Sequence, residues 1–110
     1  MSAAANMIVG GFTTVKPVTK EVKDICIKVK SQMEKKTGFR FKDFIPILYK
    51  SQVVAGINYL VKVVVSQEDG VEEDKCVHVL IFQALDCEGG KLSVTRVQTP
   101  KTIMDPLNSF

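Results

Sequence analysis

The sequence predicts an α+β domain in which one α-helix packs on an antiparallel β-sheet meander of four to five strands. Two observations predict this fold class. Apolar residues recur at helical spacing after Thr19, and four later segments are dense in β-branched and aromatic residues. The links between these segments are short, and hairpin-length links join sequential antiparallel strands.

The helix is expected to begin after Thr19 and to end at Gly38. Threonine is a favoured N-cap, and a glycine after the last turn is a frequent stop. The apolar residues between these ends fall within about 100° of arc on a helical wheel, which predicts one buried stripe. Ile27 lies off that stripe. The stripe consists of Val22, Ile25, Cys26, Val29 and Met33.

The strands are expected where valine, isoleucine and aromatic residues cluster, because these side chains favour extended backbone. Pro46 removes one hydrogen-bond donor from the first long strand, so we expect a bulge or an edge position there. The expected strands are Phe39 to Ser51, Ile57 to Val65, Val77 to Leu85 and Leu92 to Thr99, and a short strand at Phe12 to Lys16 would make a fifth.

Length and composition suit one domain of 110 residues, with a flexible N-terminal segment at residues 1–11 and a single folded unit at residues 12–110. The net charge is +3, and the basic residues mingle with acidic ones, so a nucleic-acid partner is disfavoured. Three cysteines do not make a paired disulfide framework, which favours the cytoplasm. Neither a signal peptide nor a membrane-spanning run is evident, so no membrane partner is expected.

The order of the strands predicts which turns lie together. Successive turns of an antiparallel meander alternate between the two ends of the sheet. The turns at Gln52 to Gly56 and Asp86 to Lys91 should therefore share one end, and the Ser66 to Cys76 connection should lie at the other. If Phe12 to Lys16 pairs with the next strand, the N-terminal segment also arrives at the first end.

The Gln52 to Gly56 turn is unusually apolar and has a single glycine as its only typical turn residue. Two interpretations remain open from the residues alone. In one, the strand continues through Val53 and Val54 and turns near Gly56. In the other, the turn is an apolar loop that faces a partner, because exposed apolar clusters often mark interaction sites.

At this turn the chain resembles the cystatin family of cysteine-protease inhibitors, and in particular the stefins, its disulfide-free intracellular branch. The family signature Gln-x-Val-x-Gly matches Gln52, Val54 and Gly56. The resemblance covers nearly the whole chain from Met7. Further stefin-like features are Met7 to Gly11, Lys16-Pro17 with Thr19, Lys50 to Tyr59, Val77-His78, Phe82-Gln83 with Leu85, Gln98 and Phe110.

The resemblance implies a cystatin-like fold and a reversible, tight-binding, non-covalent inhibitor of papain-like cysteine peptidases of the cathepsin type. It implies a protein without catalysis, cofactor or metal that obstructs the peptidase cleft with three segments. A monomer is expected, and a domain-swapped dimer formed through the first hairpin is the alternative state. The implied contact residues are Met7, Ile8, Val9, Gly10 and Gly11 in the N-terminal segment, Gln52, Val53, Val54, Ala55 and Gly56 in the first hairpin, and Leu85, Asp86 and Cys87 in the second.

Two departures from the stefin pattern affect these expectations. Asp86-Cys87 stands where stefins commonly have proline followed by glycine or histidine, so the second hairpin is the least secure of the three contacts. The Ser66 to Cys76 connection is longer than its stefin counterpart and rich in acidic residues, and we interpret it as a solvated loop opposite the inhibitory end.

The residues also allow functions other than inhibition. His78 and Cys76 lie two residues apart on one strand and could form a thiol-imidazole pair, but two groups do not complete a zinc site, and a mid-strand histidine is usually structural. A non-inhibitory interaction module on a cystatin scaffold is the main alternative. Cys26 is expected in the core, and Cys87 is expected to be exposed, either inert or able to form a mixed disulfide or an intermolecular bridge.

Overall fold

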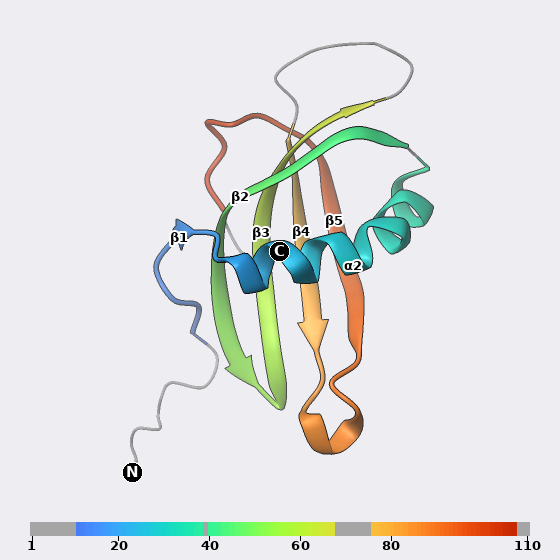
Figure 1. Cartoon of the computed structure of the whole chain (residues 1–110). Coiled ribbons are helices and arrows are strands. Elements are labelled where there is room, and N and C mark those ends of the chain that lie inside the picture. Colours follow the sequence, from blue (N-terminus) through green and yellow to red (C-terminus); the bar gives the residue numbers. More distant parts are fainter. Residues whose placement is uncertain (1–10, 39, 68–75, 108–110) are drawn as a thin grey trace.

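The structure, a computed structural model, describes residues 11–38, 40–67 and 76–107. Its sheet is antiparallel, with five strands in the order β1-β2-β3-β4-β5, and α2 crosses one face (Figure 1). The predicted α+β fold class is confirmed. The elements are β1 (Lys16–Pro17), α2 (Lys20–Thr37), β2 (Phe41–Val54), β3 (Gly56–Gln67), β4 (Cys76–Gln83), the 3-10 turn η1 (Asp86–Glu88) and β5 (Leu92–Lys101).

Both ends of α2 are capped as the sequence predicts. The Thr19 hydroxyl oxygen accepts a hydrogen bond from the Val22 N–H at 3.2 Å. Gly38 adopts the left-handed conformation at φ 79° and donates its N–H to the Glu34 carbonyl at 2.8 Å. The Glu34 carboxylate also accepts from the Phe41 N–H at 3.0 Å, so the last turn of the helix is tied to the start of β2.

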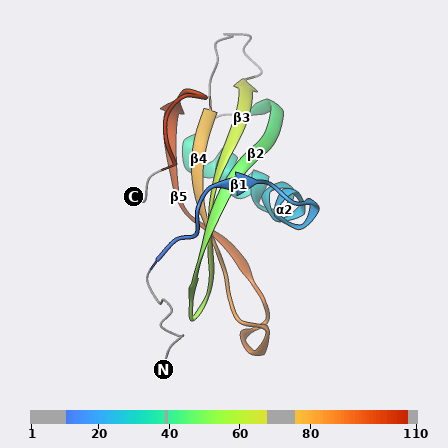
Figure 2. The same ribbon diagram turned by 90° about the vertical axis from the view of Figure 1, so that its left-hand side faces the viewer.

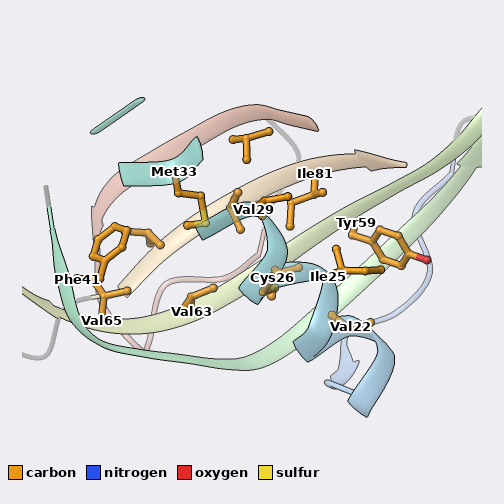
Figure 3. Packing of buried hydrophobic residues seen from close by; sticks show 14 residues of the cluster. Val22, Ile25, Cys26, Val29, Met33, Phe41, Tyr59, Val63, Val65 and Ile81 are labelled. Carbon is orange, nitrogen blue, oxygen red and sulfur yellow. The ribbon is translucent and has the colours of Figure 1, made fainter. Parts of the chain in front are cut away.

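The main core lies between α2 and the sheet (Figure 3). The helix contributes the predicted stripe, and each of its five members is at most 4% exposed, whereas Ile27 is 62% exposed on the opposite side. Alternate residues of β3 and β4 face the stripe because side chains in a strand alternate between the two faces. These strand residues are Tyr59, Val61, Val63 and Val65 from β3 and Val77, Val79 and Ile81 from β4.

Strand β2 confirms one prediction and β1 corrects another. The register of β2 shifts between Pro46 and Leu48, as expected for a proline within a strand. The short first strand does pair antiparallel with β2, but its bounds differ from Phe12 to Lys16, because β1 consists of Lys16–Pro17 alone. Beside Ser51 a side-chain hydrogen bond takes the place of the backbone ladder. The Ser51 N–H donates to the Thr13 hydroxyl oxygen at 3.1 Å instead of to a backbone carbonyl.

The face of the sheet opposite α2 is covered by the C-terminal segment Thr102–Leu107, an arrangement that the sequence did not predict. In Figure 2 this segment and α2 lie on opposite sides of the sheet. Leu107 is 4% exposed, and the Lys62 ammonium donates hydrogen bonds to the carbonyls of Ile103 and Asp105 at 2.6 and 2.5 Å. The central strands are thus buried on both faces.

Candidate functional site

Both predicted hairpins lie at one end of the sheet. A row of paired residues crosses the sheet near this end, joining Val53 to Ile57, Ile57 to Gln83 and Gln83 to Leu92. Two turns project beyond this row, one between β2 and β3 and the other between β4 and β5. Figure 1 and Figure 2 show them at the same end from two directions, as the meander argument predicts.

The first hairpin is a tight turn on two continuous strands. β2 runs through Val54, Ala55 alone links it to β3, and Gly56 is the first residue of β3. The interpretation that the strand continues through Val53 and Val54 is therefore confirmed. Val53 is also 67% exposed, so the same turn presents an apolar side chain to solvent. Just behind it, the Asn58 amide donates to the Gln52 side-chain oxygen at 2.9 Å and ties the two strands together.

The chain that leads in from the N-terminus is attached beside this hairpin. The Thr13 N–H donates to the Ser51 carbonyl at 2.8 Å. The Lys50 ammonium lies 5.6 Å from the centre of the Phe12 ring, within the range of a cation–π interaction. Gly11 is exposed at the start of the described chain, and the predicted site residues Met7 to Gly10 lie outside the described residues.

The second hairpin is longer and contains a turn of 3-10 helix that the sequence did not predict. The Ala84 N–H donates to the Lys91 carbonyl at 2.9 Å and closes its base. Within it, the N–H of Gly90 donates to the Leu85 carbonyl at 3.0 Å. Leu85 is 44% exposed, and Asp86 and Cys87 are exposed as well. All three predicted residues of this hairpin therefore lie on the surface at the same end as Val53.

Aromatic side chains brace the sheet behind the two hairpins. The Tyr59 hydroxyl lies 3.4 Å from the side-chain oxygen of Gln83, and the Tyr59 and Tyr49 rings are 6.4 Å apart. Burial raises the pKa of Tyr59 above its ordinary value, and the Glu21 carboxylate and Tyr49 raise it further. A protonated phenol can donate to Gln83, so β3 is linked to the base of the second hairpin.

A groove of about 500 Å³ lies between the first half of α2 and the second hairpin. Its charged lining comes from the helix, with Lys20 and Lys28 opposed by Glu21 and Asp24, and Gln83 lines its sheet side. The two signs balance, so the groove favours neither an anionic nor a cationic ligand.

The Cys76 and His78 pair, considered as a catalytic or metal-binding site, is buried away from both hairpins. Both side chains are 0% exposed. Burial and the positive charge of Lys62 lower the pKa of His78 to about 4, so the imidazole is neutral at pH 7. Burial raises the pKa of the Cys26 thiol in the helix-side core to about 12. Within the described residues no group of three or more His, Cys, Asp or Glu side chains is placed to hold a metal ion.

Comparison with known proteins identifies the family of this chain. Residues 10–102 match the family model described as "Cystatin domain". This chain belongs to the cystatin family. The match includes both hairpins and the lead-in segment that carries Thr13. No helix in the described part of this cystatin has the length and apolar character needed to cross a bilayer.

Individual relatives place this cystatin with the stefin type. It is 39% identical over 104 residues to Cystatin-A of Felis catus, covering 94% of this chain and 100% of the relative. It is 40% identical over 101 residues to Stefin-C of Bos taurus, covering 92% and 94%. It is 39% identical over 104 residues to Leukocyte cysteine proteinase inhibitor 1 of Sus scrofa, covering 94% and 95%. Members of the cystatin family are protease inhibitors and not enzymes.

Sequence reasoning missed part of what supports this end of the cystatin. The sequence indicated Phe82 and Gln83 only as residues that match stefins. The structure places Phe82 against the first hairpin and Gln83 against Tyr59. The signal was available in principle, because strand alternation and a correct register would put position 82 next to the β3 end of the first hairpin. The register itself depends on pairings that the sequence does not state.

Proposed function

We propose that this cystatin inhibits papain-like cysteine peptidases of the cathepsin type by inserting one end of its sheet into the active-site cleft, reversibly and without covalent chemistry. We call this end the inhibitory edge and define it as residues 7–11, 52–56 and 85–87. One observation carries the proposal: the two hairpins share one end of the sheet, and each has an exposed apolar residue there, Val53 in the first and Leu85 in the second. The name of the porcine relative, a cysteine proteinase inhibitor, supports the target class.

The first hairpin is suited to enter a narrow cleft without a large ordering cost. Its turn is a single residue, Ala55, and the Gln52 to Asn58 hydrogen bond holds the strands behind it. A rigid element loses little conformational freedom on binding, so more of the contact energy appears as affinity. Burial of the apolar Val53 side chain contributes roughly 25 cal/mol for each Å² removed from water.

The N-terminal segment would occupy the unprimed subsites through Met7, Ile8 and Val9. The anchorage of Thr13 beside Ser51 supports this, because it starts the segment at the inhibitory edge. Gly10 would pass close to the catalytic thiol, where the absence of a Cβ permits close approach. Cleavage is avoided because no peptide carbonyl of the inhibitor reaches the thiolate at the distance and angle that attack requires.

We further propose that the protein acts as a monomer in the cytoplasm. None of the three cysteines forms a disulfide, and thiols stay reduced in a reducing compartment. In a domain-swapped dimer opened at the Gln52 to Gly56 turn, the first hairpin would become one extended strand, and the inhibitory edge would lose its central contact.

Titration of papain of known active concentration with this protein tests the function. Stepwise addition should remove activity in proportion to the added inhibitor, and dilution or a displacing substrate should restore it. The peptidase-treated inhibitor should remain intact by mass spectrometry. Absent or micromolar inhibition would instead favour the non-inhibitory interaction module, which keeps the same sheet for another partner.

A further inference from the structure

Gly56 is buried against the strand that leads into the second hairpin. Its φ is 131°, a backbone conformation that residues with a Cβ rarely adopt. A Cβ at this position would lie 2.7 Å from both Cε1 and Cζ of Phe82 and closer still to the carbonyl oxygen of Gln83. The edge of the Phe82 ring therefore occupies the space directly above the Gly56 backbone.

The position of Phe82 makes this contact a link between the two hairpins. Phe82 pairs with Asn58 across the β3–β4 ladder and lies on the segment that runs into the second hairpin. Pairing with β4 ends at the Ile57 to Gln83 pair, so the tip of the first hairpin projects as a two-stranded ribbon. A ribbon of two strands has little stability by itself, and a side chain packed at its base limits its bending.

We propose that Phe82 is a positioning residue for the inhibitory edge: its ring, seated on Gly56, holds the first hairpin at a fixed orientation to the second. This inference rests on the proposed function, in which both hairpins enter one cleft together. Without the ring, the tip of the first hairpin would sample more orientations, and only some of them would fit the peptidase cleft. The cost of that selection weakens binding mainly through faster dissociation.

The experiment compares Phe82→Ala with Leu80→Ala. Leu80 is half-buried like Phe82 and lies two positions earlier on the same face of β4, opposite Leu60 and away from Gly56. Both changes remove apolar packing, so the control corrects for general destabilisation. The measurements are the dissociation rate from papain, thermal unfolding, and hydrogen exchange of the Ala55 and Ile57 amides.

We expect Phe82→Ala to raise the dissociation rate about tenfold and to speed exchange at the two hairpin amides, whereas Leu80→Ala leaves both within about threefold of the original protein. Phe82→Leu keeps an apolar group over Gly56 and should give an intermediate rate. If Phe82→Ala does not fold, the Leu variant carries the test and must still dissociate faster than Leu80→Ala.

Equal dissociation rates for the Phe82 and Leu80 variants would overturn the positioning role while leaving the proposed function intact. Failure of the unaltered protein to inhibit papain would overturn the proposed function and this inference with it. A double-mutant cycle with Gly56→Ala adds an independent check. The effects of the two changes on the dissociation rate should be less than additive, because an alanine at position 56 displaces a ring that Phe82→Ala has already removed.

Discussion

Lys62 and His78 lie directly opposite each other on β3 and β4, side by side in the layer beneath the C-terminal segment. Lys62 is 4% exposed and His78 is 0% exposed. The two side chains differ in their hydrogen bonds: the Lys62 ammonium has carbonyl partners in the C-terminal segment, whereas neither imidazole nitrogen of His78 has a hydrogen-bond partner among the described residues. The arrangement therefore favours a charged lysine beside a neutral histidine.

The first prediction concerns the stability of the protein in acid. Burial, Lys62 and Lys101 lower the pKa of His78 from 6.5 to about 4, against a smaller opposing effect of Asp105. Because the unfolded chain then binds the proton more readily, the stability from neutral His78 is fully present above pH 6.5 and is lost as pH falls toward 4. The loss should reach the order of 3 kcal/mol.

Urea unfolding at pH 7, 5 and 4 measures this loss, with His78→Leu as the comparison. The leucine variant removes two polar atoms that have no partner in the described part of the chain, and it should remain close to the original protein in stability at pH 7. Its stability should fall less between pH 6.5 and 4. Parallel pH profiles for the two proteins would show that His78 does not carry the effect.

The second prediction concerns the charge of Lys62. Lys62→Met keeps a long apolar stem but removes the positive charge next to His78 and the hydrogen bonds to Ile103 and Asp105. The pKa of His78 should rise, and amides of the Thr102–Leu107 segment should exchange faster. A proton NMR titration of the single histidine gives the pKa, and an unchanged or lower value would contradict the assigned cause.

The third prediction tests the apolar tip of the first hairpin. Val53→Asp should weaken papain inhibition at least about tenfold, because a carboxylate would be buried without a partner in the cleft. Ile45→Asp is a matched control: it lies on the same strand and is 54% exposed, against 67% for Val53, but it is far from the inhibitory edge. If the inhibition constants change equally for both variants, Val53 does not contact the peptidase.

The fourth prediction tests the N-terminal segment. Removal of Met1 to Gly10 should speed dissociation from the peptidase, by a factor that depends on the unprimed subsites of each target, with little change in the association rate. Removal of Met1 to Asn6 alone keeps the proposed contact residues and serves as the control. Dissociation rates that stay the same after the longer deletion on several peptidases would exclude the segment from binding.

The fifth prediction concerns thiol access. Cys26 and Cys76 are buried and Cys87 is exposed. A thiol reagent applied to the folded protein should therefore modify Cys87 alone, as mapped by peptide mass spectrometry, and denaturant should expose the other two. Absence of labelling at Cys87 would exclude its use in a mixed disulfide, and early labelling of Cys26 would contradict the packing of the helix.

The sequence predictions succeeded where the interacting residues are close together in the chain and failed where they are far apart. Thr19 and Gly38 end the helix as predicted because each cap acts on residues within one turn. The bulge at Pro46 was also predictable, since a missing N–H is a local property. The first strand pairs with β2 but starts later than Phe12, because the Thr13 hydroxyl, a side-chain group, takes the Ser51 N–H that a regular ladder would give to a carbonyl.

For the inhibitory edge, strand connectivity was enough to predict that the two hairpins lie together, because turns of a meander alternate between its ends. The support beneath them was not predictable. The contact between the Phe82 ring and Gly56 depends on the register between β3 and β4. It also depends on which side chain fills the space that a Cβ on residue 56 would occupy. The 3-10 turn at Asp86–Glu88 was likewise not predicted from the sequence.

The amino-acid sequence alone determined the helix, its buried stripe, most of the strands and the shared end of the hairpins, because capping, periodicity and short links act between near neighbours in the chain. Only the tertiary structure decided that a lysine and a histidine would be buried together and that the C-terminal segment would cover them. Those outcomes depend on which groups distant segments bring together, and a lysine at position 62 finds its carbonyl partners about forty residues away.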